Sequence, residues 1–489
     1  MLYRKGWQGC TQGFRSLASI LAVACVLLAS CTEGNREPTE ADLSAFGIFV
    51  DSLDTSLEGK WFSRMGMSDD VDELLSFLRS ELPRHGLDTT AFSIPQIAED
   101  MDVVRRLAFD SVGVSINEVL PRLDSLLSKA YVCYATGQRY GFMQPKLFNK
   151  LNYKANGEGY ARLFDYEVKA PNAKEAEEKL SSSGRMEFLQ ASQPKGYVYT
   201  ALQEQLEKTT DKAVRHKIAV NMERCRWQMK HPAENERMVL VNIPAQQLWA
   251  IGEDSVLEMR VCCGATTTKT PLLSSAISYM QVNPDWIIPS NIVKTDVSRH
   301  GGDSAYFARH RYYIIDRSSG DTLRPADVSA SDLTSGRLRI GQKGGAGNSL
   351  GRIVFRFPNN FSVYLHDTNN RGAFSRERRT LSHGCVRVQK PFELACFLLP
   401  DADDWTKDRL RISMDMTPET EQGRIYLQEH SDAPRPYRLE TYREVSPRVP
   451  IYIIYYTAYP NPMTGVVETW PDLYDYDKVI SQEMGSLLL

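Results

Sequence analysis

The chain has 489 residues, enough for two or three domains, because single hydrophobic cores rarely grow beyond about 250–300 residues. Hydrophobic residues make up 42% and aromatic residues 10% of the chain, which excludes global disorder. With 58 Lys and Arg against 61 Asp and Glu, the net charge of −3 indicates no nucleic-acid partner and no basic footprint for an anionic membrane.

Residues 1–30 are predicted to be an export signal. Arg4, Lys5 and Arg15 precede the apolar run SLASILAVACVLLAS, which is too short to span a bilayer comfortably. The run ends in LASC, which resembles a bacterial lipobox, so we expect Cys31 to be lipidated as the first mature residue. The alternatives are an ordinary signal peptide or a retained membrane anchor.

Residues 31–64, which begin with the polar, Pro-containing TEGNREPTEAD after Cys31, would tether the protein to the membrane. No later stretch is apolar enough for a transmembrane helix. We therefore expect a periplasmic lipoprotein whose N-terminal lipid anchors it to a membrane, with the outer membrane favoured over the inner one.

The cysteines that follow Cys31 do not form a regular pattern. Their irregular spacing in a large chain disfavours a disulfide framework. Cys396 lies in the apolar run FELACFLL and is predicted to be a core thiol, and the vicinal Cys262 and Cys263 should pack on opposite faces of a strand. Cys385 needs a separate explanation.

Residues 65–230 are predicted to form a helical domain. LLSFLRSEL and INEVLPRLDSLLSKAYVCYA have apolar residues at three- and four-residue spacing, and PRHG and HGLD are breaks between helices. AKEAEEKL reads as a solvated helix, and residues 201–230 are again helical and rich in charge. No motif here indicates chemistry, so we interpret this part as a support domain.

Residues 237–484 are predicted to form a mostly β domain with a few helices. Short β-rich runs such as MVLVNIP, VLEMRVCCG, RIVFRFP and VPIYIIYYTAY alternate with clusters of Gly, Pro, Asn and Asp. The glycine-rich GQKGGAGNSLG does not match a phosphate-binding loop. The predicted fold class is α+β, with the helical domain preceding the β domain.

The stretch LSHGCVRV, residues 381–388, has the parts of a nucleophilic site. An imidazole, from His366 or His383, could take the proton of the Cys385 thiol. Gly384 would let backbone N–H groups approach a developing oxyanion. Arg387, two residues on in an extended segment, would share the face of Cys385 and could favour the thiolate or hold a carboxylate.

Spacing alone leaves three alternatives open. A Cys/His hydrolase or acyltransferase is the favoured one. His366, His383 and Cys385 could instead be three ligands of a zinc ion with an open fourth position. Cys385 could also be a buried thiol beside histidines that have other partners.

The segment HDTNNRGAFSRERRTLSHGCVRV resembles the signature of the L,D-transpeptidases, in which a histidine and a spacer precede Ser/Thr-His-Gly-Cys and an arginine. VLVNIPAQQLWAI and GNSLGRIVFRFPN resemble the YkuD-like catalytic domain of the large periplasmic branch, and NMERCRW resembles its helical scaffold. The resemblance covers residues 65–480, with 295–340 corresponding to a capping insertion over the active site.

The resemblance implies cross-linking of peptidoglycan stem peptides. Cys385 would attack the carbonyl of the third, diamino-acid residue of a donor tetrapeptide and expel D-alanine. The side-chain amine of a second stem would then resolve the thioacyl enzyme. No cofactor or metal is implied, and carbapenem-type inhibitors would acylate Cys385.

The resemblance also implies the roles of site residues. His366 would be the base, oriented by a backbone carbonyl just after it, and the N–H groups of Gly384 and Cys385 would form the oxyanion hole. Further residues would shape the site or hold substrate: His383, Ser382, Arg387, Tyr364 and Asn348.

The sequence leaves two other functions open. An L,D-carboxypeptidase or amidase would give the same thioacyl intermediate to water. A non-catalytic cell-wall-binding lipoprotein would use the fold for binding alone, but the intact His366, Gly384, Cys385 and Arg387 argue against it.

Overall fold

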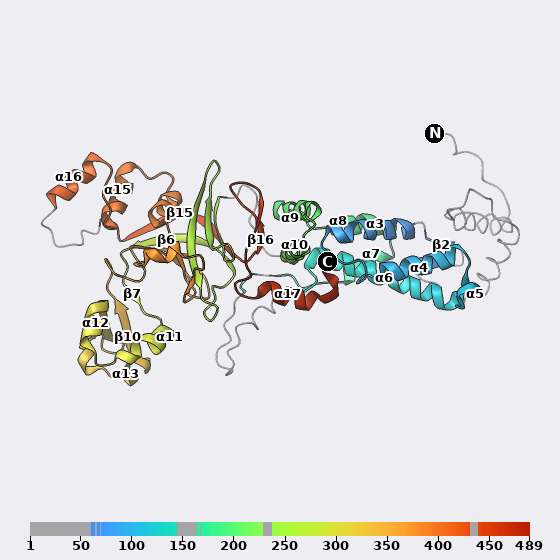
Figure 1. Cartoon of the computed structure of the whole chain (residues 1–489). Coiled ribbons are helices and arrows are strands. Elements are labelled where there is room, and N and C mark those ends of the chain that lie inside the picture. The colour runs from blue at the N-terminus through green and yellow to red at the C-terminus, as the bar shows by residue number, and fades with distance from the viewer. Residues whose placement is uncertain are drawn as a thin grey trace.

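The computed structural model describes residues 60–63, 66–68, 70–143, 164–166, 168–227, 237–430 and 439–489. The predicted signal peptide, the lipidation site Cys31 and nearly all of the tether lie outside these residues. A helical region, a large β domain and a small α/β subdomain follow one another in space (Figure 1). None of the described helices is long and apolar enough to cross a lipid bilayer.

The N-terminal region is helical, which confirms this part of the predicted α+β fold. A short hairpin of β1 (Phe62–Ser63) and β2 (Gly66–Met67) precedes it. Its helices are α3 (Asp70–Arg84), α4 (Ile94–Arg105), α5 (Phe109–Val112), α6 (Ile116–Tyr140), α7 (Lys174–Leu180), α8 (Arg185–Ala191), α9 (Tyr197–Lys208) and α10 (Lys212–Arg226). Ser115 and Glu118 form a capping box that starts α6.

The C-terminal end of the chain packs against this helical region. α17 (Tyr476–Met484) and η7 (Gly485–Leu487) follow the last strands, and Figure 1 shows α17 beside the helices. The guanidinium of Arg224 in α10 lies 2.6 Å from the carboxylate of Asp477 in α17. Our predicted β domain, which runs to residue 484, therefore ends in a helix that contacts the helical region.

The second region is a large sheet. Its strands are β3 (Met238–Asn242), β4 (Gln247–Ile251), β5 (Val256–Gly264), β6 (Leu273–Val282), β11 (Ile353–Arg356), β12 (Leu365–His366), β13 (Thr380–Ser382), β14 (Val386–Val388) and β15 (Tyr442–Ile454). They are ordered β13, β5, β14, β12, β11, β6, β15, β3, β4. Because β5 also pairs with β4, the sheet closes on itself, and β13 is the described strand of this sheet that pairs on one side only, with β5.

Short elements surround the large sheet. They are η6 (Arg371–Ser375), α14 (Pro391–Leu398), α15 (Asp404–Ser413), α16 (Glu421–Glu429) and the hairpin of β16 (Ala458–Pro460) and β17 (Val467–Thr469). Cys262 and Cys263 in β5 are both fully buried. Cys262 packs with Ala373 and Phe374, whereas Cys263 belongs to the main core, as strand alternation predicts.

A small subdomain, residues 286–342, is inserted between β6 and β11. Its sheet has the order β7 (Trp286–Ile287), β10 (Leu338–Gln342), β8 (Tyr312–Asp316), β9 (Thr322–Leu323). Its helices are α11 (Ser290–Ile292), η3 (Val293–Val297), η4 (Ser298–His300), α12 (Ser304–His310), η5 (Pro325–Asp327) and α13 (Ala330–Thr334). It has its own hydrophobic core, which includes Phe307, Ile314 and Leu333. We call it the capping subdomain; it is wider than the expected segment 295–340.

A buried ion pair in α10 holds the helices together. Arg226 and Glu223 are both fully buried, with 3.4 Å between guanidinium nitrogen and carboxylate oxygen. Arg226 also donates to the carbonyl of His85 (2.6 Å) and to the side chain of Gln138 (3.0 Å). Glu223 accepts from the backbone N–H of Phe142 (2.8 Å). The pair thus ties α10 to α3 and α6 with most of its polar atoms satisfied.

Replacing Arg226 with methionine should lower the free energy of unfolding by about 3–5 kcal/mol, because the Glu223 carboxylate would remain buried without its cation. Arg84→Met is the matched control: it removes a half-exposed guanidinium paired with Glu81 and Glu207 and should cost about 1 kcal/mol or less. Urea unfolding followed by circular dichroism would compare the variants. Equal losses would show that the buried pair has no special role.

Candidate active site

Two strands bring the candidate catalytic residues together. β12 and β14 run parallel, with Leu365 opposite Val386 and His366 opposite Arg387. Because side chains alternate between the faces of a strand, the first pair enters the core while His366 and Arg387 face a pocket. Cys385 directly precedes β14. The chain between His366 and Cys385 is the return connection that parallel pairing requires.

Hydrogen bonds around Ser382 shape the turn before β14. The Ser382 hydroxyl donates to the carbonyl of Cys385 (2.5 Å) and accepts from the N–H of Gly384 (3.2 Å). Gly384 has a φ of +117°, which L side chains rarely adopt. Space for a side chain is not the constraint at Gly384, since no atom lies closer than 3.8 Å to where a Cβ would be. The backbone conformation therefore explains the glycine. The Gly384 N–H already has a partner, so it does not present a free donor to an oxyanion.

His366 is held in one tautomer. Its Nδ1 lies 2.5 Å from the carbonyl oxygen of Asp367. Because a carbonyl can only accept, Nδ1 carries the proton of the neutral ring and Nε2 is its acceptor nitrogen. The backbone of Leu350 is a further hydrogen-bond partner of the ring. Burial, and after it the positive charge of Arg387, lowers the pKa of His366 to about 3. The resting imidazole is therefore neutral near pH 7.

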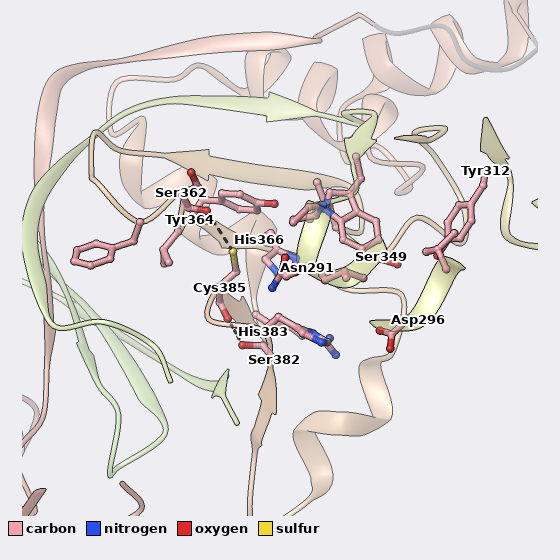
Figure 2. A pocket seen from close by; sticks show the side chains of 18 of the residues that line it. Asn291, Asp296, Tyr312, Ser349, Ser362, Tyr364, His366, Ser382, His383 and Cys385 are labelled. Carbon is pink, nitrogen blue, oxygen red and sulfur yellow. Dashed lines mark hydrogen bonds between the residues drawn. The ribbon is translucent and has the colours of Figure 1, made fainter. Parts of the chain in front are cut away.

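The Cys385 sulfur lies among polar groups in the pocket, and the residue is partly exposed. It is 3.9 Å from the carbonyl oxygen of Ser362, as Figure 2 shows. Burial raises the pKa of the Cys385 thiol, while hydrogen bonds from the backbone and the hydroxyl of Tyr364 and the charges of Arg356 and Arg387 partly oppose this shift. The resting sulfur is thus a thiol, and the cationic neighbours do not by themselves produce a thiolate.

Tyr364 connects Cys385 to the capping subdomain. Its ring packs under the guanidinium of Arg356, which lies 4.1 Å from the ring centroid. Its hydroxyl hydrogen-bonds to Cys385 and to the side chain of Trp286. Burial raises the pKa of Tyr364, so this hydroxyl stays protonated and can donate. The capping subdomain, through Trp286 of β7, is therefore hydrogen-bonded to the tyrosine that contacts the Cys385 sulfur.

Arg387 places an unneutralised positive charge beside the pocket. Its Nε is buried and has no hydrogen-bond partner. Among the described residues, no carboxylate forms an ion pair with its guanidinium. A buried N–H without a partner is unfavourable, so the site is prepared to accept an anionic oxygen.

The pocket has a volume of about 430 Å³ and two walls. The first wall belongs to the large sheet and includes Cys385, His366 and Ser382. The second belongs to the capping subdomain and consists of Trp286, Pro289, Asn291, Ile292, Asp296, Val297, Tyr306 and Tyr312. Figure 2 shows Asp296 and Tyr312 across the pocket from the sulfur. Such a cleft between two units is a usual place for a binding site.

The structure gathers most of the residues that the sequence singled out. Six of them line the pocket: Cys385, His366, His383, Ser382, Arg387 and Tyr364. Asn348 does not, and a direct substrate contact is not supported there. It is fully buried, and its amide donates to the carbonyl of Lys343 (3.1 Å) and accepts from the N–H of Leu350 (2.8 Å). Asn348 therefore shapes the loop that presents Ser349 and Leu350 to the pocket.

Sequence analysis missed Ser362 and the aromatic wall. Ser362 has a φ of +55°, which is uncommon outside glycine, and its carbonyl faces the sulfur. Asn359 holds this turn by accepting from the N–H groups of Phe361 (3.0 Å) and Val363 (3.1 Å). The dipeptide Asn-Asn before Phe361 is a turn signal that could have drawn attention to the loop.

No group of three His, Cys, Asp or Glu side chains among the described residues is arranged to hold a metal ion. The geometry therefore does not support the zinc alternative.

The comparisons with known proteins agree with this geometry. Residues 236–409 match the family model of the L,D-transpeptidase catalytic domain (YkuD), and residues 57–206 match that of the Scaffold domain. A Haemophilus influenzae protein provisionally named an L,D-transpeptidase is 31% identical over 271 residues. The alignment covers 55% of this chain and 49%, about half, of that relative. The chain therefore combines a Scaffold domain with a catalytic domain of the L,D-transpeptidase family.

Proposed function

We propose that this protein is a peptidoglycan L,D-transpeptidase that uses Cys385 as its nucleophile. The observation that carries the proposal is a neutral imidazole, His366, fixed by the Asp367 carbonyl in the same pocket as the Cys385 thiol. A thiol and an oriented base are the two parts that acyl transfer through a thioester requires. The family of the catalytic domain supports the same reaction class.

The first half-reaction forms the thioacyl enzyme. Nε2 of His366 takes the proton of the Cys385 thiol as the sulfur attacks the carbonyl of the third residue of a donor tetrapeptide. The tetrahedral intermediate collapses, the bond to the terminal D-alanine breaks, and imidazolium gives its proton to the departing amine. Because His366 begins neutral and ends neutral, the cycle needs no external acid or base at this stage.

The second half-reaction joins two stems. The neutral side-chain amine of the diamino acid of a second stem attacks the thioester, and His366 accepts one of its protons. Collapse of this intermediate forms the new amide and returns the proton to the Cys385 sulfur. Entry of water instead of the amine would give the rival carboxypeptidase reaction.

Arg387 is proposed to couple substrate binding to base strength. Its charge is one cause of the low pKa of His366. A substrate carboxylate at the unpaired guanidinium would offset that charge and raise the pKa of His366 toward the operating pH. A base is most effective when its pKa lies near that pH, so binding would activate His366.

The oxyanion is proposed to form at the turn before β14. The backbone N–H of Cys385 is the first candidate donor. The Gly384 N–H now donates to the Ser382 hydroxyl over 3.2 Å. It would be a second donor only if it left that hydroxyl and donated to the oxyanion instead. His383, which is exposed and lines the pocket, is proposed to contact substrate rather than to act as the base.

Membrane attachment is part of the proposal. Lipidation at Cys31 would hold the enzyme in the periplasm beside its polymeric substrate, on the outer membrane rather than the inner one. The supporting observation is the lipobox-like LASC after the apolar run.

Cys385→Ala should abolish dimer formation from disaccharide-tetrapeptide, and His366→Ala should slow it by about 10²–10⁴-fold, because the general base is lost. Mass spectrometry of the products would measure both effects. Cys133→Ala, at an exposed thiol far from the pocket, is the matched control and should leave the rate unchanged. Dimers made at the normal rate by Cys385→Ala would refute the mechanism. Tripeptide as the sole product of the unsubstituted protein would favour the carboxypeptidase.

Alkylation of Cys385 by iodoacetamide should accelerate with pH and reach half its maximum at a higher pH than alkylation of an ordinary cysteine. The thiolate reacts, and burial raises the pKa of Cys385 above its ordinary value, so the thiolate fraction stays small below that pKa. Peptide mapping at successive pH values would give the profile, with N-acetylcysteine as the reference thiol. A midpoint below that of the reference would indicate a preformed thiolate.

A carbapenem should add one drug mass to the protein, at Cys385 alone. The strained amide offers a carbonyl to the same nucleophile, and the product is a stable thioester. Intact-protein mass followed by peptide mapping would locate the adduct. Modification of the exposed Cys133 instead would point to nonspecific thiol chemistry.

A further inference from the structure

The pocket carries opposite charges on its two walls. Among its lining side chains, Asp296 has the only carboxylate and Arg387 the only guanidinium. Asp296 belongs to the capping subdomain and Arg387 to β14 of the large sheet. In the described part of the chain, neither forms an ion pair with another side chain. Both charges are therefore available to a ligand.

Asp296 stands on an unusual piece of backbone. Residues 293–297 form η3, a π-helical turn between α11 and η4. Such turns are rare and occur often at functional sites, because the extra residue redirects the side chains that follow. Here Val293 and Val297 are buried in the core of the capping subdomain, whereas Asp296 is exposed toward the pocket.

The side chains around Asp296 strengthen the attraction of its carboxylate for a cation. Tyr306 and Tyr312 line the same wall, and burial followed by neighbouring charge, including that of Asp296, raises the pKa of both phenols. These rings limit access of water on one side of the carboxylate. A cation bound there would therefore be less screened than at an open surface.

We propose that Asp296 is a specificity-determining residue that binds the side-chain ammonium of the donor stem's diamino acid, while Arg387 receives a carboxylate of the same stem. This inference rests on the proposed function and deepens it by naming the group that selects the donor. Two opposite charges on facing walls complement a residue that carries both an ammonium and a carboxylate.

The position of Asp296 favours the donor over the acceptor. An acceptor amine must be neutral and must reach the thioester carbon at Cys385. Figure 2 shows Asp296 on the wall opposite Cys385 and His366. A carboxylate there would keep an amine charged and away from the sulfur, which suits a group that is recognised but does not react.

Thioacyl-enzyme formation by the full chain tests the inference. One donor tetrapeptide has the free side-chain amine at its third residue, and the other has the same amine acetylated. Rapid quenching and intact mass would give kcat/KM for acylation with each. The free-amine donor should be preferred about tenfold, as expected for one charge-assisted contact, and Asp296→Asn should reduce that preference to about one.

The control is Asp321→Asn, which removes an exposed carboxylate of the same subdomain that does not line the pocket, and it should keep the preference. Normal acylation of Asp296→Asn by the acetylated donor shows that the variant is folded. A preference unchanged in Asp296→Asn overturns the inference alone. A variant that is acylated normally but transfers slowly to the acceptor also overturns it, because Asp296 would then serve the acceptor. No adduct on the unsubstituted protein with either donor overturns the proposed function itself.

Discussion

The parallel pairing of β12 with β14 is the constraint on which the candidate site depends. Register in a sheet is specified wherever one face is buried, because a slip of one residue would move every side chain to the other face. Here Leu365 and Val386 must enter the core, so His366 and Arg387 must share the opposite face. Packing of apolar residues thereby determines the position of the charged and candidate catalytic groups, which contribute little to the core.

Burial is the second determinant of the chemistry. It lowers the pKa of His366 and raises that of Cys385, so the resting pair is a neutral imidazole and a thiol rather than an ion pair. A neutral pair avoids the desolvation cost of two buried charges. In the proposed mechanism, charge on His366 and Cys385 would develop only when substrate enters, and Arg387 already lies beside them.

The capping subdomain supplies what the large sheet lacks. It has its own hydrophobic core, so its wall keeps its shape independently of the sheet. Through Trp286 it reaches Tyr364 and thus the sulfur, and through Asp296 it contributes the negative charge of the pocket. The described part of the helical region contributes no residue to the pocket. A buried ion pair, Arg226 with Glu223, holds its helices together.

The sequence alone determined the features that depend on neighbours along the chain. Apolar spacing in residues 71–140 predicted helices, β-rich runs after 237 predicted the sheet domain, and the motif around Cys385 indicated a candidate nucleophile and the family. Tertiary structure decided the rest, because strand pairing and insertion join residues that are far apart in sequence. It assigned Asn348 to a buried loop, brought the Ser362 carbonyl to the sulfur and placed Asp296 opposite Cys385. No local pattern encodes such distances, since they arise only when the sheet and the capping subdomain pack around one pocket.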